Sequence, residues 1–174
     1  MNHPVDPVGA AATALDNRSW IPADHELTLA REFFVRRDAL DQRLLPGMPP
    51  CPSPQGWTTQ HVLWLGDVAA LATDLLNAWR PWLPEGHGHM ASLLTTYATM
   101  AASAAPLATR LVRDWADAWQ GQGTVSPQDT SRWEDWHLPK EQREQLDALT
   151  DRLVMVGAVM VMAVNRGETS GPRR

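Results

Sequence analysis

The chain has 174 residues, the size of one domain around a single hydrophobic core. Twenty acidic and fifteen basic residues give a net charge of −5, which disfavours nucleic-acid binding because such binding depends on a basic surface. The single cysteine, Cys51, cannot form an internal disulfide, and the N-terminus lacks the basic and apolar pattern of a signal peptide. We therefore expect a cytoplasmic protein.

The first 20 residues contain two prolines and no sustained hydrophobic period. They predict a mobile arm with at most a short helical turn at 10–15. A helix over 23–45 is expected next, because Pro22 suits a first turn and Asp24 favours a helix N-terminus. One face of this helix carries the apolar residues Leu27, Ala30, Phe33, Phe34, Leu40 and Leu44.

A proline-rich segment at 46–56 contains five prolines in eleven residues, a density that excludes both helix and central strand. We interpret it as a stiff connector, and a ligand for an aromatic groove is the alternative. The following pattern predicts a helix over 58–80. Its apolar stripe is wide, so we expect it to contact at least two other helices.

A long helical pattern covers 90–120 and contains Pro106. The apolar positions keep their phase across the proline, which favours one kinked helix over two separate helices. Residues 121–139 are rich in turn formers, and Ser131 with Glu134 has the spacing of a capping box for one extra short helix.

The last helix is expected over 139–165, with Gly167 as its C-terminal cap and 167–174 as a disordered tail. Four main helices without any strand pattern predict an all-α fold. The whole is a single-domain bundle over 21–166, with one extra short helix and a proline-rich connector.

Residues 153–164, LVMVGAVMVMAV, form twelve consecutive positions without a charged or strongly polar side chain. A surface helix normally keeps one polar face, and this segment has none. It is also too short for a membrane span, which needs about 20 apolar residues. We expect protein to cover it on all sides, either at the centre of the bundle or across a subunit interface.

Three residues in a loop, Glu85, His87 and His89, offer oxygen and nitrogen atoms that a transition metal could use. Histidines two apart do not share a helix face, and no H-E-x-x-H or paired E-x-x-H motif occurs. We interpret these residues as a polar loop and expect no metal and no cofactor.

The helix over 58–80 carries His61, Asp67 and Asp74. His61 is interpreted as a hydrogen-bonded core histidine. The two aspartates are two helical turns apart, too far for a catalytic dyad, so we expect them to pair with arginines of neighbouring helices, Arg37 being the candidate. If the bundle instead binds a small ligand or metal, His61, Asp67 and Tyr97 would line a pocket between the helices over 58–80 and 90–120.

Nine tryptophans are the remaining anomaly, because tryptophan is enriched where proteins bind each other. Packing of these tryptophans within the bundle is the alternative.

No catalytic motif is present in the sequence, and its absence does not decide whether the protein is an enzyme. We expect a non-enzymatic bundle that acts through protein–protein contacts, as a homo-oligomer or a subunit of a larger assembly. The alternative is the ligand- or metal-binding bundle, acting as a sensor or enzyme. The expected interface residues are Val156, Met160, Val161, Trp115, Trp119, Trp133 and Trp136.

Overall fold

The computed structural model describes residues 6–44, 57–83, 88–122 and 139–169, with the backbone alone for 114–122. Within these ranges the chain is helical and contains no strand. This confirms the expected all-α bundle. The elements are α1 (Pro7–Asp16), α2 (Asp24–Asp41), α3 (Thr59–Trp79), a 3₁₀ turn (Arg80–Trp82), α4 (His89–Gln122) and α5 (Lys140–Thr169).

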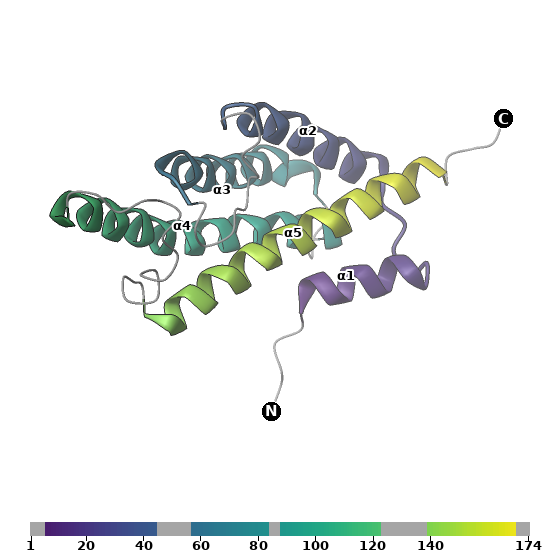
Figure 1. Ribbon diagram of the computed structural model, residues 1–174. Helices are drawn as coiled ribbons and strands as arrows, with labels where there is room; N and C mark the ends of the chain where they lie inside the picture. The colour runs from purple at the N-terminus through teal and green to yellow at the C-terminus, as the bar shows by residue number, and fades with distance from the viewer. Residues whose placement is uncertain (1–5, 45–56, 84–87, 123–138, 170–174) are drawn as a thin grey trace.

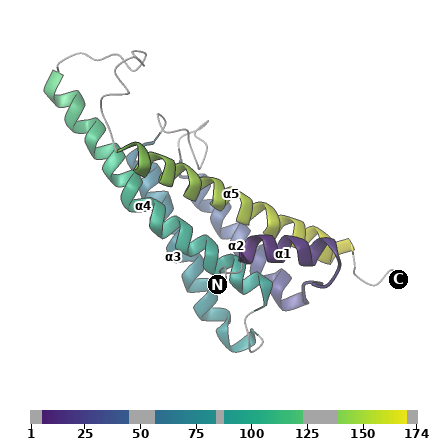
Figure 2. The same cartoon turned by 90° about the horizontal axis from the view of Figure 1, so that it is seen from below.

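Four of the helices form a closed ring of neighbours, in which α2 packs on α3, α3 on α4, α4 on α5 and α5 on α2. The fifth, α1, lies outside this ring against α4 and α5 (Figures 1 and 2). Helices α2 and α5 run antiparallel: Leu27 approaches Gly167, and Arg37, ten residues later, approaches Gly157. The outer side of α5 is therefore flanked by α1 and α2.

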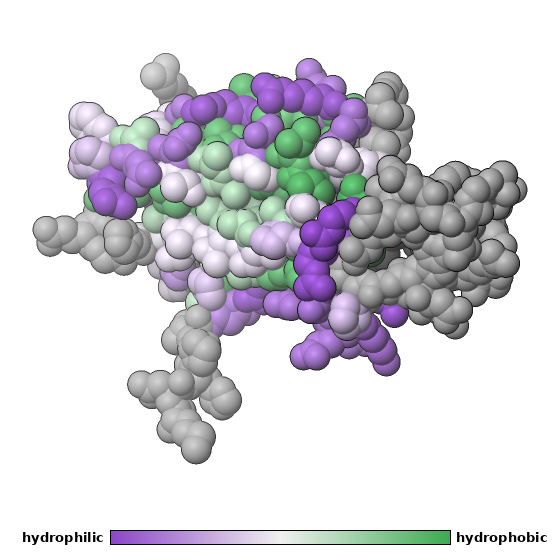
Figure 3. All heavy atoms as spheres, turned by 90° about the vertical axis from the view of Figure 1, so that its left-hand side faces the viewer, coloured by the Kyte–Doolittle hydropathy of each residue, from purple (hydrophilic) through white to green (hydrophobic). Residues whose placement is uncertain are grey.

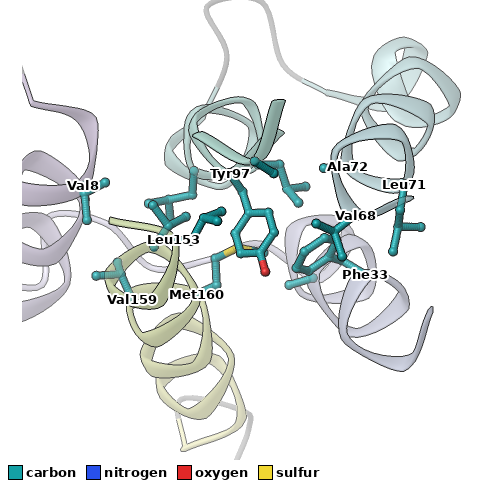
Figure 4. Packing of buried hydrophobic residues seen from close by; sticks show 14 of the residues in the cluster. Val8, Phe33, Val68, Leu71, Ala72, Tyr97, Leu153, Val159 and Met160 are labelled. Carbon is teal, nitrogen blue, oxygen red and sulfur yellow. The ribbon is translucent and has the colours of Figure 1, made fainter. Parts of the chain in front are cut away.

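The core lies inside the ring, where side chains from all four helices meet (Figure 4). Tyr97 of α4 is buried at its centre, between Met160 of α5 and Phe33 of α2. The Phe33 and Tyr97 rings meet edge to face, with centroids 5.1 Å apart. Val68 adds the contribution of α3. Helix α3 packs on both α2 and α4, which explains why its apolar stripe is wide.

Helix α1 differs from the arm that was expected over residues 1–20. Asp6 caps it by accepting a hydrogen bond from the Val8 N–H at 3.1 Å, and Pro7 occupies the first turn. One face of the helix is buried in the molecule, through Val8, Ala11, Ala14 and Leu15. Pro7 suits this position, since a proline in the first turn of a helix gives up no hydrogen bond.

Helix α4 runs without interruption through Pro106, so the single-helix interpretation is correct. Proline has no N–H to donate to the carbonyl of Ala102, and this loss weakens a helix interior. Packing compensates here, because Ala101 and Ala104 before the proline and Ala108 and Leu111 after it are all buried in one core.

Helix α5 continues to Thr169, so the expected cap at Gly167 is wrong. Gly167 lies inside the helix, where α2 comes close: a β-carbon there would stand 2.5 Å from a methyl carbon of Leu27. Next to this contact, Arg31 of α2 pairs with Glu168 at 3.0 Å. A side chain at position 167 would therefore require Leu27 to move, and the helix continues two residues beyond the glycine.

Candidate functional site

The outer side of α5 exposes a row of apolar side chains, which we call the α5 face: Val154, Met155, Ala158, Val161 and Met162. The four larger members are 44–60% exposed. Within the described ranges eight large hydrophobic residues are exposed, and these four are half of them, within nine residues of one helix. Residues three, four and seven apart share a helix side, so the row is continuous.

Of the two alternatives for 153–164, burial on every side at the centre of the bundle is wrong, because four of its large side chains are exposed. Cover across a subunit interface stays a prediction. Val156 and Met160, two of the expected interface residues, are fully buried in the chain's own core. Val161, a third, is exposed and belongs to the α5 face. An uninterrupted apolar run does not show which side of its helix points inward, so the sequence could not separate the two sets.

The neighbours of α5 fix its orientation. On one edge Arg152 forms an ion pair with Asp6, and Val159 is buried on the side of α1 (Figure 4). On the other edge Gly157 lies beside Arg37 of α2, since a β-carbon added at Gly157 would stand 3.6 Å from the Arg37 guanidinium. The α5 face lies between these two edges, and α5 crosses the front of the molecule in Figure 1.

Exposed apolar surface also occurs elsewhere, as it does on most proteins. Figure 3 shows the side that lies at the left in Figure 1, where green hydrophobic patches alternate with purple hydrophilic residues. The other exposed large residues stand on separate elements: Ile21, Val35, Leu63 and Trp82. The α5 face is distinguished by its continuity along one helix rather than by the exposure of any single side chain.

Charged residues border the α5 face at its two ends. Asp147 and Asp151 precede it, and Arg166, partly exposed, follows it. Desolvation raises the pKa of Asp147, and the neighbouring charge of Asp151 raises it further. The nearby Arg143 guanidinium lowers the pKa only in part, so it stays above its ordinary value.

Three tryptophans are part of the structural framework. The indole N–H of Trp64 donates to Asp41 at 2.7 Å, that of Trp79 to Glu32 at 3.1 Å, and that of Trp20 to Glu26 at 3.3 Å. All three carboxylates belong to α2, so these bonds attach α2 to its neighbours.

For these three tryptophans the packing interpretation holds, whereas Trp82 is 72% exposed. The side chains of Trp115 and Trp119 lie outside the described part of the structure. So do Trp133, Trp136 and the short helix expected around them.

The residues of the alternative ligand site have separate structural surroundings. Nδ1 of His61 accepts the Thr58 N–H at 3.1 Å, so this buried histidine caps α3, as a hydrogen-bonded core residue should. Tyr97 is in the core beside Phe33, whereas Asp67 is about half exposed and pairs with Arg43 at 3.5 Å. Asp67 thus has the arginine partner that was expected, but the partner is Arg43 and not Arg37. Arg37 pairs with Asp41 of its own helix.

A surface hollow of about 260 Å³ between α2 and α3 includes Asp67 but neither His61 nor Tyr97. It is lined by Leu40, Arg43, Leu44, Gln60, Leu63, Trp64 and Asp67. This hollow is not the pocket that was expected between α3 and α4, which stays a prediction.

The possible metal loop is only partly described, because Glu85 and His87 fall outside the described ranges. His89 lies at the start of α4, with its ring centroid 4.9 Å from that of Trp20. In the part of the chain that is described, no three histidine, cysteine, aspartate or glutamate side chains come together as a metal site would require.

Over the same ranges, no helix combines the length and the apolar character that crossing a membrane demands. Comparison with models of known protein families, with curated proteins and with solved structures finds no match for this chain.

Proposed function

We propose that this protein acts by protein–protein association through the α5 face, as a homo-oligomer or as a subunit of a larger assembly. The observation that carries the proposal is the continuous row of half-exposed valine and methionine side chains on one helix. Contiguous exposed apolar surface is a mark of binding sites, whereas apolar residues scattered singly over a surface are ordinary.

The expected strength of the association follows from the size of this row. Fully burying a valine or methionine contributes roughly 1.5–3 kcal/mol, so covering the exposed half of four such residues contributes roughly 3–6 kcal/mol. Association costs at least about 4 kcal/mol in lost freedom. Since the two amounts are similar, we expect an association that depends on protein concentration.

The experiment measures absolute mass by light scattering behind size exclusion over a dilution series. The native mass in a fresh extract of the producing cells is measured beside it. Met162→Glu places a charge in the α5 face and should reduce the mass to the 19.3 kDa of one chain. Val35→Glu is the matched control, because Val35 is 70% exposed on α2 and does not belong to the α5 face, and it should leave the mass unchanged.

A wild-type mass of one chain both in the purified sample and in the extract would contradict the proposal. So would a larger species that survives Met162→Glu. Circular dichroism of both variants checks that any loss of mass does not come from unfolding.

A further inference from the structure

We propose that α1 is a hinged cover on the four-helix ring, which opens as one unit while α2 to α5 stay folded and thereby uncovers Val159 beside the α5 face. Three features of the molecule support this opening: the ring closes without α1, the buried face of α1 is small, and an exposed segment separates α1 from a fixed anchor at Trp20. The opening is independent of the proposed function, and only its meaning for association rests on that function.

The four-helix ring is complete without α1. Helices α2, α3, α4 and α5 each pack on two neighbours within the ring, whereas α1 packs on α4 and α5 from outside (Figures 1 and 2). Among the largest fully buried side chains of the described residues, α1 contributes Leu15, and all the others belong to the four ring helices. Departure of α1 therefore leaves most of the core in place.

The buried face of α1 is small. It consists of Val8, Ala11, Ala14 and Leu15, so two of its four buried side chains are single methyl groups. Hydrophobic stabilisation is roughly proportional to the apolar area removed from water, so this face holds α1 less firmly than the longer helices hold one another. A helix of 10 residues is also marginal in water without its packing. We therefore expect α1 to unfold when it leaves the ring.

An exposed segment follows α1 and ends at a fixed anchor. Residues 16–19, which we call the hinge segment, are exposed and lie between the buried side chains of Leu15 and Trp20. The indole N–H of Trp20 donates to Glu26 of α2 at 3.3 Å, and the centroid of its ring lies 4.9 Å from that of His89 in α4. Trp20 therefore stays with the ring, and α1 moves about the hinge segment.

The closed state holds backbone strain in the hinge segment. Arg18 has a φ of 60°, in the left-handed region that favours glycine, and among the non-glycine residues that the structure describes it is the one with a positive φ. Hydrogen bonds at the end of α1 impose this conformation, since the Trp20 N–H donates to the Ala14 carbonyl at 3.0 Å. Unfolding of α1 releases the strain, which favours the open state.

Opening of α1 changes one edge of the α5 face. Arg152 of α5 pairs with Asp6, and Val159, seven residues further along, lies on the same side of the helix. Val159 is buried there, on the side of α1 (Figure 4). It stands four residues after Met155 and three before Met162, so it borders the α5 face. Without α1, the apolar surface offered for association is wider by this valine.

Thiol labelling of the full chain measures the opening. Each variant carries Cys51→Ser, so that one cysteine is present. Val8→Cys and Leu15→Cys place probes seven residues apart in the buried face of α1, and Val68→Cys and Leu65→Cys are the matched controls, fully buried in α3. Both α1 probes should react at least about tenfold faster than their controls, because a segment that opens locally exposes its residues more often than the whole fold does.

A substitution in the ring separates local opening from unfolding of the whole chain. Ala72→Gly removes a buried methyl group from the interior of α3, far in sequence from α1. It should accelerate labelling of the α3 probes about fivefold, through the lower helix propensity of glycine. Labelling of the α1 probes should not change, because their opening leaves α3 folded.

A substitution in the hinge segment tests the strain. Arg18→Gly relieves the left-handed backbone and stabilises the closed state, so labelling of both α1 probes should slow about threefold. Arg18→Ala is the matched control, because it removes the guanidinium but keeps the strain, and it should leave the rates unchanged. Amide hydrogen exchange of the wild-type chain repeats the comparison without any substitution: the amides of α1 should exchange together, and before those of α3.

Three results would overturn the hinged cover. Acceleration of all four probes by Ala72→Gly, or equal rates in α1 and α3, would mean that α1 opens only with the whole fold. Fast labelling of Val8→Cys without Leu15→Cys would mean that one end of the helix frays. The proposed function fails separately: labelling in dilute protein measures the opening, whereas the mass measures association, so the mass of one chain at every concentration leaves the hinged cover intact.

Discussion

The two sides of α5 are built from the same kinds of residue and meet different surroundings. Its inner side consists of Leu153, Val156, Met160 and Ala163, which are buried against α2 and α4 and the rest of the core. The outer side repeats valine, methionine and alanine and is half exposed. Hydrophobicity alone therefore does not locate a core. The position of a side chain relative to the neighbouring helices decides whether it stabilises the fold or remains available to a partner.

The largest expected effect comes from making the same substitution on both sides. Met160→Ala should lower the free energy of unfolding by about 2–4 kcal/mol, because a fully buried side chain is lost and a cavity remains. Met162→Ala should change it by less than about 0.5 kcal/mol in dilute protein. Urea unfolding at low concentration measures both. Equal losses would mean that the outer side is also packed within the single chain.

A second pair of substitutions tests how closely α5 approaches α2. Gly167→Ala should destabilise the protein by about 1 kcal/mol, since overpacking against the buried Leu27 outweighs the gain in helix propensity. Gly66→Ala is the matched control inside α3, where no atom stands within 4 Å of the added methyl group. It should stabilise the protein by about 0.5–1 kcal/mol. Thermal unfolding of both compares the signs, and stabilisation by both would contradict the contact between α2 and α5.

The smallest effects concern two carboxylates at the borders of α5. Desolvation raises the pKa of Asp6, but the Val8 N–H and the Arg152 guanidinium outweigh it, so the pKa lies below its ordinary value of 3.8. The charged Asp6 therefore stabilises the fold at neutral pH, and this contribution is lost as pH falls through the folded pKa. Desolvation and Asp151 raise the pKa of Asp147, so its charge destabilises the fold at neutral pH and protonation relieves it.

At pH 7, Asp6→Asn should lower the melting temperature and Asp147→Asn should raise it. Each change corresponds to a few tenths of a kcal/mol, as is usual for exposed charges. The difference between either variant and the wild type should shrink as the pH is lowered below about 4, because the wild-type carboxyl then becomes neutral as well. Shifts of the same sign at pH 7 would contradict the opposite environments of the two residues.

Much of the fold was predictable, because helix periodicity and proline positions are local signals. The patterns over 58–80 and 90–120 match α3 and α4 closely. The unbroken spacing of the apolar residues correctly predicted that α4 continues through Pro106. The errors arose where one local signal has two meanings. Pro7 starts a helix instead of breaking one, and Gly167 makes room for Leu27 instead of ending a helix.

The candidate site was predictable only as a segment. An unbroken apolar run from 153 to 164 identified the helix that carries the α5 face, but the expected residues Val156 and Met160 are core. No polar position inside the run marks its outer side, so nothing in the sequence distinguishes Met160 from Met162.

The sequence by itself determined the helical class, most of the helix ranges and the unusual apolar character of α5, since these depend on residues close together along the chain. The tertiary structure decided which side of α5 points outward. That choice depends on where α1 and α2 flank the helix, through contacts such as Asp6 with Arg152 and Leu27 with Gly167, whose partners are far apart in sequence.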